Sequence, residues 1–69
     1  MKLSARNALT GTISRITRGP VSTEVTIGIA KGVEIVSVIT TNSAKRLKLK
    51  KGQRAYALIK ADHVIVGVD

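Results

Sequence analysis

The chain has 69 residues, a formal net charge of +8 and no cysteine. This length predicts one domain, residues 1–69, whose core is too small to be stable without help, most commonly from other chains. The lack of cysteine excludes disulfides and thiolate metal sites, and a single histidine cannot build a zinc or catalytic cluster.

Two strands are expected in the first part of the chain, over residues 7–16 and 21–30. The apolar alternation of the first strand changes phase near residues 14–15, which indicates a β-bulge or a bend. Between the strands, residues 18–20 (Arg-Gly-Pro) predict a turn, because glycine permits positive φ and proline fixes φ.

A third strand is expected over residues 33–41. Apolar side chains fall on both of its faces, which is typical of a closed barrel wall or a subunit interface. Residues 41–43 (Thr-Asn-Ser) are of helix N-cap type, and a short helix is expected over residues 44–49, with Ala44 and Leu47 on its inner side.

Two further strands are expected, over residues 53–60 and 64–68, with a short turn between them. The resulting order of elements, β-β-β-α-β-β, is that of the OB barrel. We therefore predict an all-β fold with one short helix, arranged as a five-stranded OB-like barrel.

The positive charge favours an anionic partner: nucleic acid, anionic lipid or a small oxyanion. Tyr56 is the only aromatic residue, which argues against a base-stacking platform for single strands. Duplex binding through phosphates stays open. The cations within residues 45–51 are interpreted as a solvated surface that complements the helix dipole, in preference to a nucleic-acid patch.

The sequence contains no recognisable catalytic constellation. The four acidic residues, Glu24, Glu34, Asp62 and Asp69, have no acid–base spacing, and His63 has no nucleophile motif beside it. Neither standard glycine-rich phosphate loop is present. We therefore expect a binding protein and not an enzyme.

Three groups of hydrogen-bond donors, residues 4–6, 40–43 and 60–61, are typical of an anion site. The plainer interpretation is that they are turn residues and solvated charges. In an OB barrel the first strand pairs antiparallel with the fourth, which would bring Arg6 beside Lys60. Residues 40–43 would lie at the opposite end, where a helix N-terminus offers free N–H groups. Two chains related by a two-fold axis could close all three groups on one ion, whereas a single chain could not.

Four stretches in register carry a family resemblance over essentially the whole chain: Ser4-Ala5-Arg6-Asn7, residues 38–43, residues 47–52 and residues 57–61. They resemble the molbindin (Mop) family of small molybdenum-pterin-binding proteins, whose TOBE/Mop domain also occurs in molybdate-responsive regulators and molybdate transport ATPases. The resemblance implies an OB-like barrel and a homo-hexamer built as a trimer of dimers. It further implies intracellular binding and storage or buffering of molybdate or tungstate, held as the oxyanion between subunits.

The resemblance also implies which residues bind. One half of a dimer-interface site would come from Ser4, Ala5 (through its backbone N–H), Arg6, Lys60 and Ala61, and the other half from Thr40 and Ser43 of the neighbouring chain. A second oxyanion site, near the three-fold axis, would involve Asn7, Arg18 and Gly19.

Two alternatives remain beside the oxyanion-binding oligomer: an OB-type nucleic-acid-binding protein that uses its basic surface, and a plain assembly module. No signal-peptide pattern and no run of 18 apolar residues occur in the sequence, so we expect a cytoplasmic protein without a membrane partner.

Overall fold

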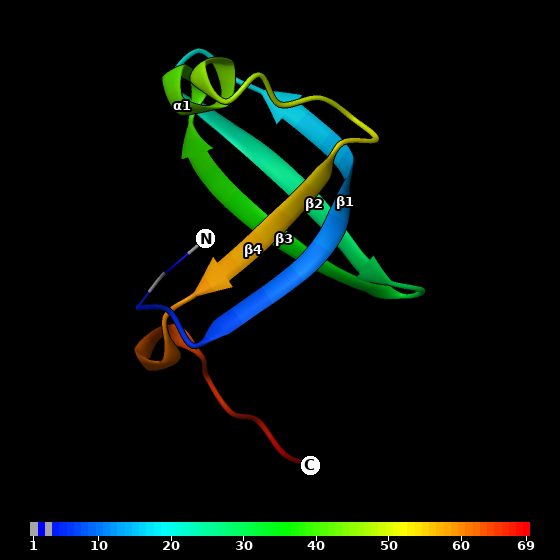
Figure 1. Cartoon of the computed structure of the whole chain (residues 1–69), viewed down its shortest axis with the longest axis vertical. Coiled ribbons are helices and arrows are strands. Elements are labelled where there is room, and N and C mark those ends of the chain that lie inside the picture. The colour runs from blue at the N-terminus through cyan, green and yellow to red at the C-terminus, as the bar shows by residue number, and fades with distance from the viewer. Residues whose placement is uncertain (1, 3) are drawn as a thin grey trace.

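Four antiparallel strands and one short helix make up the computed structural model, which describes residue 2 and residues 4–69. The elements are β1 (Asn7–Arg18), β2 (Ser22–Ala30), β3 (Val33–Thr40), α1 (Thr41–Arg46), β4 (Arg54–Ile59) and a 3₁₀ turn, η1 (Ala61–His63). The strands form one sheet in the order β3-β2-β1-β4. The sheet curls into an open barrel with α1 at one end and the C-terminal segment at the other (Figure 1). The predicted all-β, OB-like fold with one short helix is confirmed.

The long strand β1 connects the two halves of the sheet. Its first half pairs with β4, from Asn7 to Thr12, and its second half pairs with β2, from Thr12 to Arg18. The register with β2 shifts between Ile13 and Arg15, so the predicted bulge is confirmed. A bulge bends and twists a strand, which lets β1 serve two partners that diverge.

The core is small, as the chain length led us to expect. It centres on Ile13, Val25, Ile27 and Ala57, with other apolar side chains only partly buried around it. No helix in the described part of the chain is long and apolar enough to cross a membrane.

The helix begins three residues earlier than predicted. Thr40 is its N-cap, because the Thr40 hydroxyl accepts a hydrogen bond from the Ser43 N–H at 3.0 Å. Ala44 faces the interior and is fully buried, as predicted. Leu47 is the C-cap. Its side chain lines a cavity of the open barrel, on the predicted inner side, but remains 56% exposed.

A buried pair of threonine hydroxyls holds α1 against the turn between β1 and β2. The Thr41 hydroxyl donates to the Gly19 carbonyl at 2.7 Å and lies 2.8 Å from the Thr23 hydroxyl. Since Thr41 has one hydroxyl proton, Thr23 must donate to Thr41. The Thr41 N–H also donates to the Val21 carbonyl at 2.8 Å. The start of α1 is therefore fixed by three hydrogen bonds.

Replacing Thr41 by valine should destabilise the protein by about 1–3 kcal/mol, because it keeps the shape but leaves the buried Thr23 hydroxyl without its acceptor. Chemical unfolding at a fixed protein concentration measures this loss. Thr10→Val, at an exposed position of β1, is the matched control and should change stability by less than about 0.5 kcal/mol. Equal losses in both variants would contradict the role given to Thr41.

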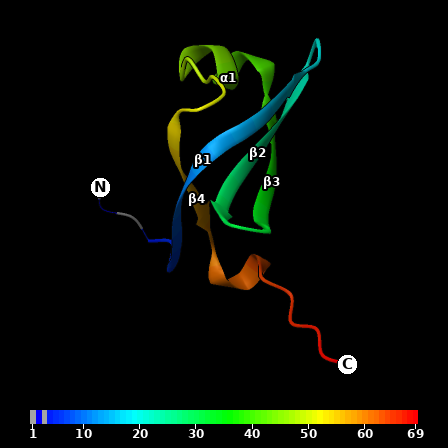
Figure 2. The ribbon, with the colours of Figure 1, turned by 90° about the vertical axis from the view of Figure 1, so that its right-hand side faces the viewer.

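The predicted fifth strand, residues 64–68, is absent from the sheet. Ile65, Val66 and Val68 are 94%, 84% and 92% exposed. In η1 the His63 N–H donates to the Lys60 carbonyl at 3.0 Å, and the segment that follows leads away from the sheet (Figure 2). The sequence pattern is that of a strand, but a strand forms only where a partner satisfies its backbone groups. Among residue 2 and residues 4–69 the segment has no such partner, and these residues form four strands.

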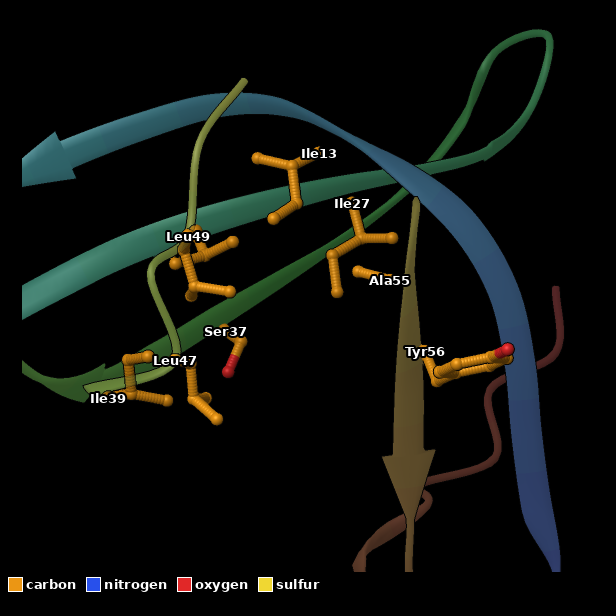
Figure 3. A pocket seen from close by; sticks show the side chains of 9 residues that line it. Ile13, Ile27, Ser37, Ile39, Leu47, Leu49, Ala55 and Tyr56 are labelled. Atoms are coloured by element: carbon orange, nitrogen blue, oxygen red, sulfur yellow. The ribbon is translucent and has the colours of Figure 1, made fainter. Parts of the chain in front are cut away.

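Without a fifth strand the barrel stays open between β3 and β4, the two edges of the sheet. A cavity of about 150 Å³ lies there, lined mainly by apolar side chains of the sheet and of the loop after α1. Figure 3 shows Ser37 of β3 and Ala55 of β4 among the side chains that border this space. A second cavity extends along the same two edges, past Val36 and Leu58.

Candidate functional site

The pairing of β1 with β4 brings the first and last donor groups together, as predicted. Asn7 pairs with Ile59, and the Asn7 side-chain amide donates to the Ile59 carbonyl at 3.2 Å. One position beyond this pair come Arg6 and Lys60, which therefore leave the sheet side by side. Ser4 and Ala61 follow at the same end.

The charges of Arg6 and Lys60 are not neutralised in the described part of the chain. Both side chains are exposed, and neither forms an ion pair with a carboxylate there. Asp62, the acidic residue closest to Lys60 in sequence, has its carboxylate 3.7 Å from the imidazole of His63. Two adjacent like charges repel each other, and a bound anion would relieve this repulsion.

At the other end, the hydroxyls of Thr40 and Ser43 lie together. The Thr40 hydroxyl donates to the Ser43 hydroxyl oxygen at 2.8 Å and accepts from the Ser43 N–H at 3.0 Å. The Ser43 hydroxyl proton therefore remains available for another acceptor. Two N–H groups at the helix start, those of Thr41 and Ser43, are already bonded, so this end offers fewer free donors than the sequence predicted.

A single chain keeps these two donor groups apart. Arg6 and Lys60 lie where β1 meets the end of β4, whereas Thr40 and Ser43 lie beside the start of β2, at the α1 end (Figure 1). The two groups lie near opposite ends of β1, whose 12 residues rise by about 3.3 Å each, whereas a hydrogen bond spans only about 3 Å. One small anion cannot contact both groups of the same chain, which agrees with the expectation of a site shared by two chains.

The residues predicted for a second oxyanion site are also separated. Asn7 begins β1 and Arg18 ends it. The Arg18 guanidinium donates to the Leu49 carbonyl at 3.0 Å, and the Gly19 N–H donates to the Ser22 carbonyl at 2.9 Å. These donors have partners within the chain, and only a second chain could bring Asn7 near Arg18.

Sequence reasoning missed the positioning role of Thr41, which it treated only as one of three cap candidates. Thr41 holds the start of α1, and with it Thr40 and Ser43, against the β1–β2 turn. A signal was present in Thr23, a polar residue on the otherwise apolar face of β2. A buried hydroxyl on such a face needs a hydrogen-bond partner.

Comparisons with known proteins give consistent results. The model of the TOBE domain family matches residues 3–66. The chain is 52% identical over 69 residues to the molybdenum transport protein ModE of Herbaspirillum seropedicae, covering 100% of this chain and 26% of that protein. The chain thus spans about a quarter of that relative. It is 44% identical to a probable molybdenum-pterin-binding protein of Haemophilus influenzae, and the match covers 100% of both.

Among solved structures, the chain is similar to the cytoplasmic molybdate-binding protein ModG, in a crystal form with molybdate bound. The TM-score is 0.94 at 48% sequence identity, and the match covers 100% of this chain and 49% of that one. Both the backbone and the sequence therefore match a protein of known ligand over the full length of the chain.

Proposed function

Because the chain belongs to the TOBE domain family, we propose that it binds molybdate or tungstate as the intact oxyanion and stores or buffers it in the cytoplasm. Full-length similarity to a molybdenum-pterin-binding protein supports the ligand class. Similarity to ModG, a cytoplasmic molybdate-binding protein, supports both the ligand and the compartment. The proposed role is binding and not catalysis. A nucleic-acid function is not favoured, since these relatives bind molybdenum compounds.

The observation that carries the proposal is the juxtaposition of Arg6 and Lys60 without a neutralising carboxylate in the described residues. Their two positive charges match the two negative charges of molybdate. Neutral donors would complete one half of the site: the Ser4 hydroxyl and the backbone N–H groups of Ala5 and Ala61. Thr40 and Ser43 of a second chain would supply the other half, with Ser43 contributing its uncommitted hydroxyl proton.

A site of this kind requires an oligomer, and the C-terminal segment supports one. Residues 64–68 carry Val64, Val66 and Val68 on one face of an extended segment, and the barrel lacks a strand between β3 and β4. We expect each segment to fill the gap of a second copy, in a reciprocal two-fold exchange. Three such dimers would make the hexamer that the resemblance implies.

Strand exchange would also join the two halves of the site. The exchanged segment begins three residues after Ala61, at Val64. Entry into the partner's gap from its α1 end would place Lys60 and Ala61 beside Thr40 and Ser43 of that partner. The second site, with Asn7, Arg18 and Gly19, would then form where three dimers meet.

Titration calorimetry and native mass spectrometry test the proposed function together. We expect an oligomer that binds molybdate and tungstate, and that binds sulfate more weakly because sulfate is the smaller tetrahedral dianion. Phosphate at the same ionic strength controls for binding to general positive charge. A monomer that shows no heat of molybdate binding would contradict the proposal.

A further inference from the structure

A second group of cations, separate from Arg6 and Lys60, lies at the α1 end of the molecule. We call it the cationic cap. It consists of Arg18 at the end of β1 and five residues of α1 and the following loop: Lys45, Arg46, Lys48, Lys50 and Lys51. All six are exposed. No acidic residue occurs between residues 35 and 61, and the described residues contain no ion pair that involves the cap.

The backbone of the cap is held in one shape although its charges repel. The Arg18 guanidinium donates to the Leu49 carbonyl at 3.0 Å, and the Lys50 N–H donates to the Gln53 side chain at 3.0 Å. Lys48 has φ of 54°, a left-handed conformation that is uncommon outside glycine. The loop thus keeps its lysines gathered at this end. Complementing the dipole of a six-residue helix requires only one or two of these charges.

The cap lies close to one half of the proposed anion site. Lys45 is two residues from Ser43 in the same helix. A helix of six residues is only about 9 Å long, at about 1.5 Å per residue. This is comparable to the Debye length of about 8 Å at physiological ionic strength, so an anion that approaches Ser43 experiences the charge of the cap.

We propose that the cationic cap steers molybdate into the site: it speeds association without contacting the bound anion. A surface of one sign raises the local concentration of an oppositely charged ligand and increases association rates by about 10- to 1,000-fold, in a salt-dependent manner. Steering would therefore explain why the chain carries more positive charge than the bound anion requires. This inference rests on the proposed function, because it concerns the capture step of the same site.

The test compares two variants of equal net charge in the full-length oligomer. Lys45→Gln/Lys48→Gln removes two charges from the cap. Lys31→Glu removes the same net charge from the β2–β3 turn, at the other end of these two strands. Release of molybdate to an excess of a chromogenic catechol gives the dissociation rate, and calorimetry gives Kd. The dissociation rate divided by Kd gives the association rate.

We expect the association rate of the cap variant to fall about tenfold at low salt, with an unchanged dissociation rate. Lys31→Glu should change it less than twofold, and the difference should vanish at high salt. Equal association rates in the two variants, or faster dissociation in the cap variant, would overturn the inference alone. Failure of the unmodified protein to bind molybdate would overturn the proposed function as well. Unchanged rates together with cap-dependent retention of a DNA duplex at physiological salt would assign the cap to nucleic acid instead.

Discussion

Replacing Val66 by aspartate is expected to dissociate the oligomer and abolish tight molybdate binding, while each chain stays folded. Val66 is 84% exposed in the single chain, so the substitution changes little of the packing within it. In the gap between β3 and β4 of a second copy, the new carboxylate would be buried without a partner, which costs several kcal/mol. Sedimentation measures the mass, circular dichroism the fold, and calorimetry the binding.

The size of this effect follows from the apolar surface at stake. Full burial of each of the three valines on one face of residues 64–68 contributes about 1.5–3 kcal/mol, and a reciprocal exchange buries two such segments. This range can exceed the roughly 4–15 kcal/mol that association costs in lost freedom of motion. One unpaired carboxylate in each gap cancels much of the net free energy that remains after the cost of association. The assembly should therefore dissociate and not merely weaken.

Val21→Asp is the matched control. Val21 is also a largely exposed valine, at 74%, but it lies in the turn between β1 and β2, outside residues 64–68. It should keep the mass of the unmodified protein. If Val66→Asp also kept that mass, the exchange of C-terminal segments would be wrong, whatever the oligomer.

The sequence predicted most accurately those features that are determined within one chain. The phase break in the first strand located the bulge near Ser14, and turn residues separated β1 from β2 and β2 from β3. The helix start was misplaced because Thr40, Thr41 and Ser43 can all cap a helix, and the choice depends on contacts to Gly19 and Val21 that are remote in sequence. Local pattern alone does not contain these contacts.

The prediction of a fifth strand was wrong for a different reason. The alternating valines in residues 64–68 have a high propensity for a β-strand, but a strand forms only beside a hydrogen-bonding partner. The same limit applies to the site. The neighbouring positions of Arg6 and Lys60 could be predicted from strand pairing, because both residues adjoin the ends of paired strands of one chain. Thr40 and Ser43 could approach Arg6 and Lys60 only from a second chain, and the sequence pattern does not give the position of such a chain.

Lys60→Ala should weaken molybdate binding by about tenfold to a hundredfold. A charge-assisted hydrogen bond contributes about 1.5–3 kcal/mol, and each 1.4 kcal/mol corresponds to one decade in Kd. Ser43→Ala should weaken binding less, since a neutral hydroxyl bond contributes about 0.5–1.5 kcal/mol. Calorimetry measures both. A loss in Ser43→Ala larger than in Lys60→Ala would contradict the assignment of the charge to the Lys60 half of the site.

Mixing these two variants tests whether the halves come from different chains. In a dimer of one Lys60→Ala chain and one Ser43→Ala chain, one site combines both substitutions and the other combines neither. Oligomers reassembled from an equal mixture should therefore regain a fraction of sites with the affinity of the unmodified protein. If both halves belonged to one chain, every site would carry one substitution in any mixture. Mixed oligomers that never bind more tightly than the better parent would rule out the two-chain site, even in a protein that still binds molybdate.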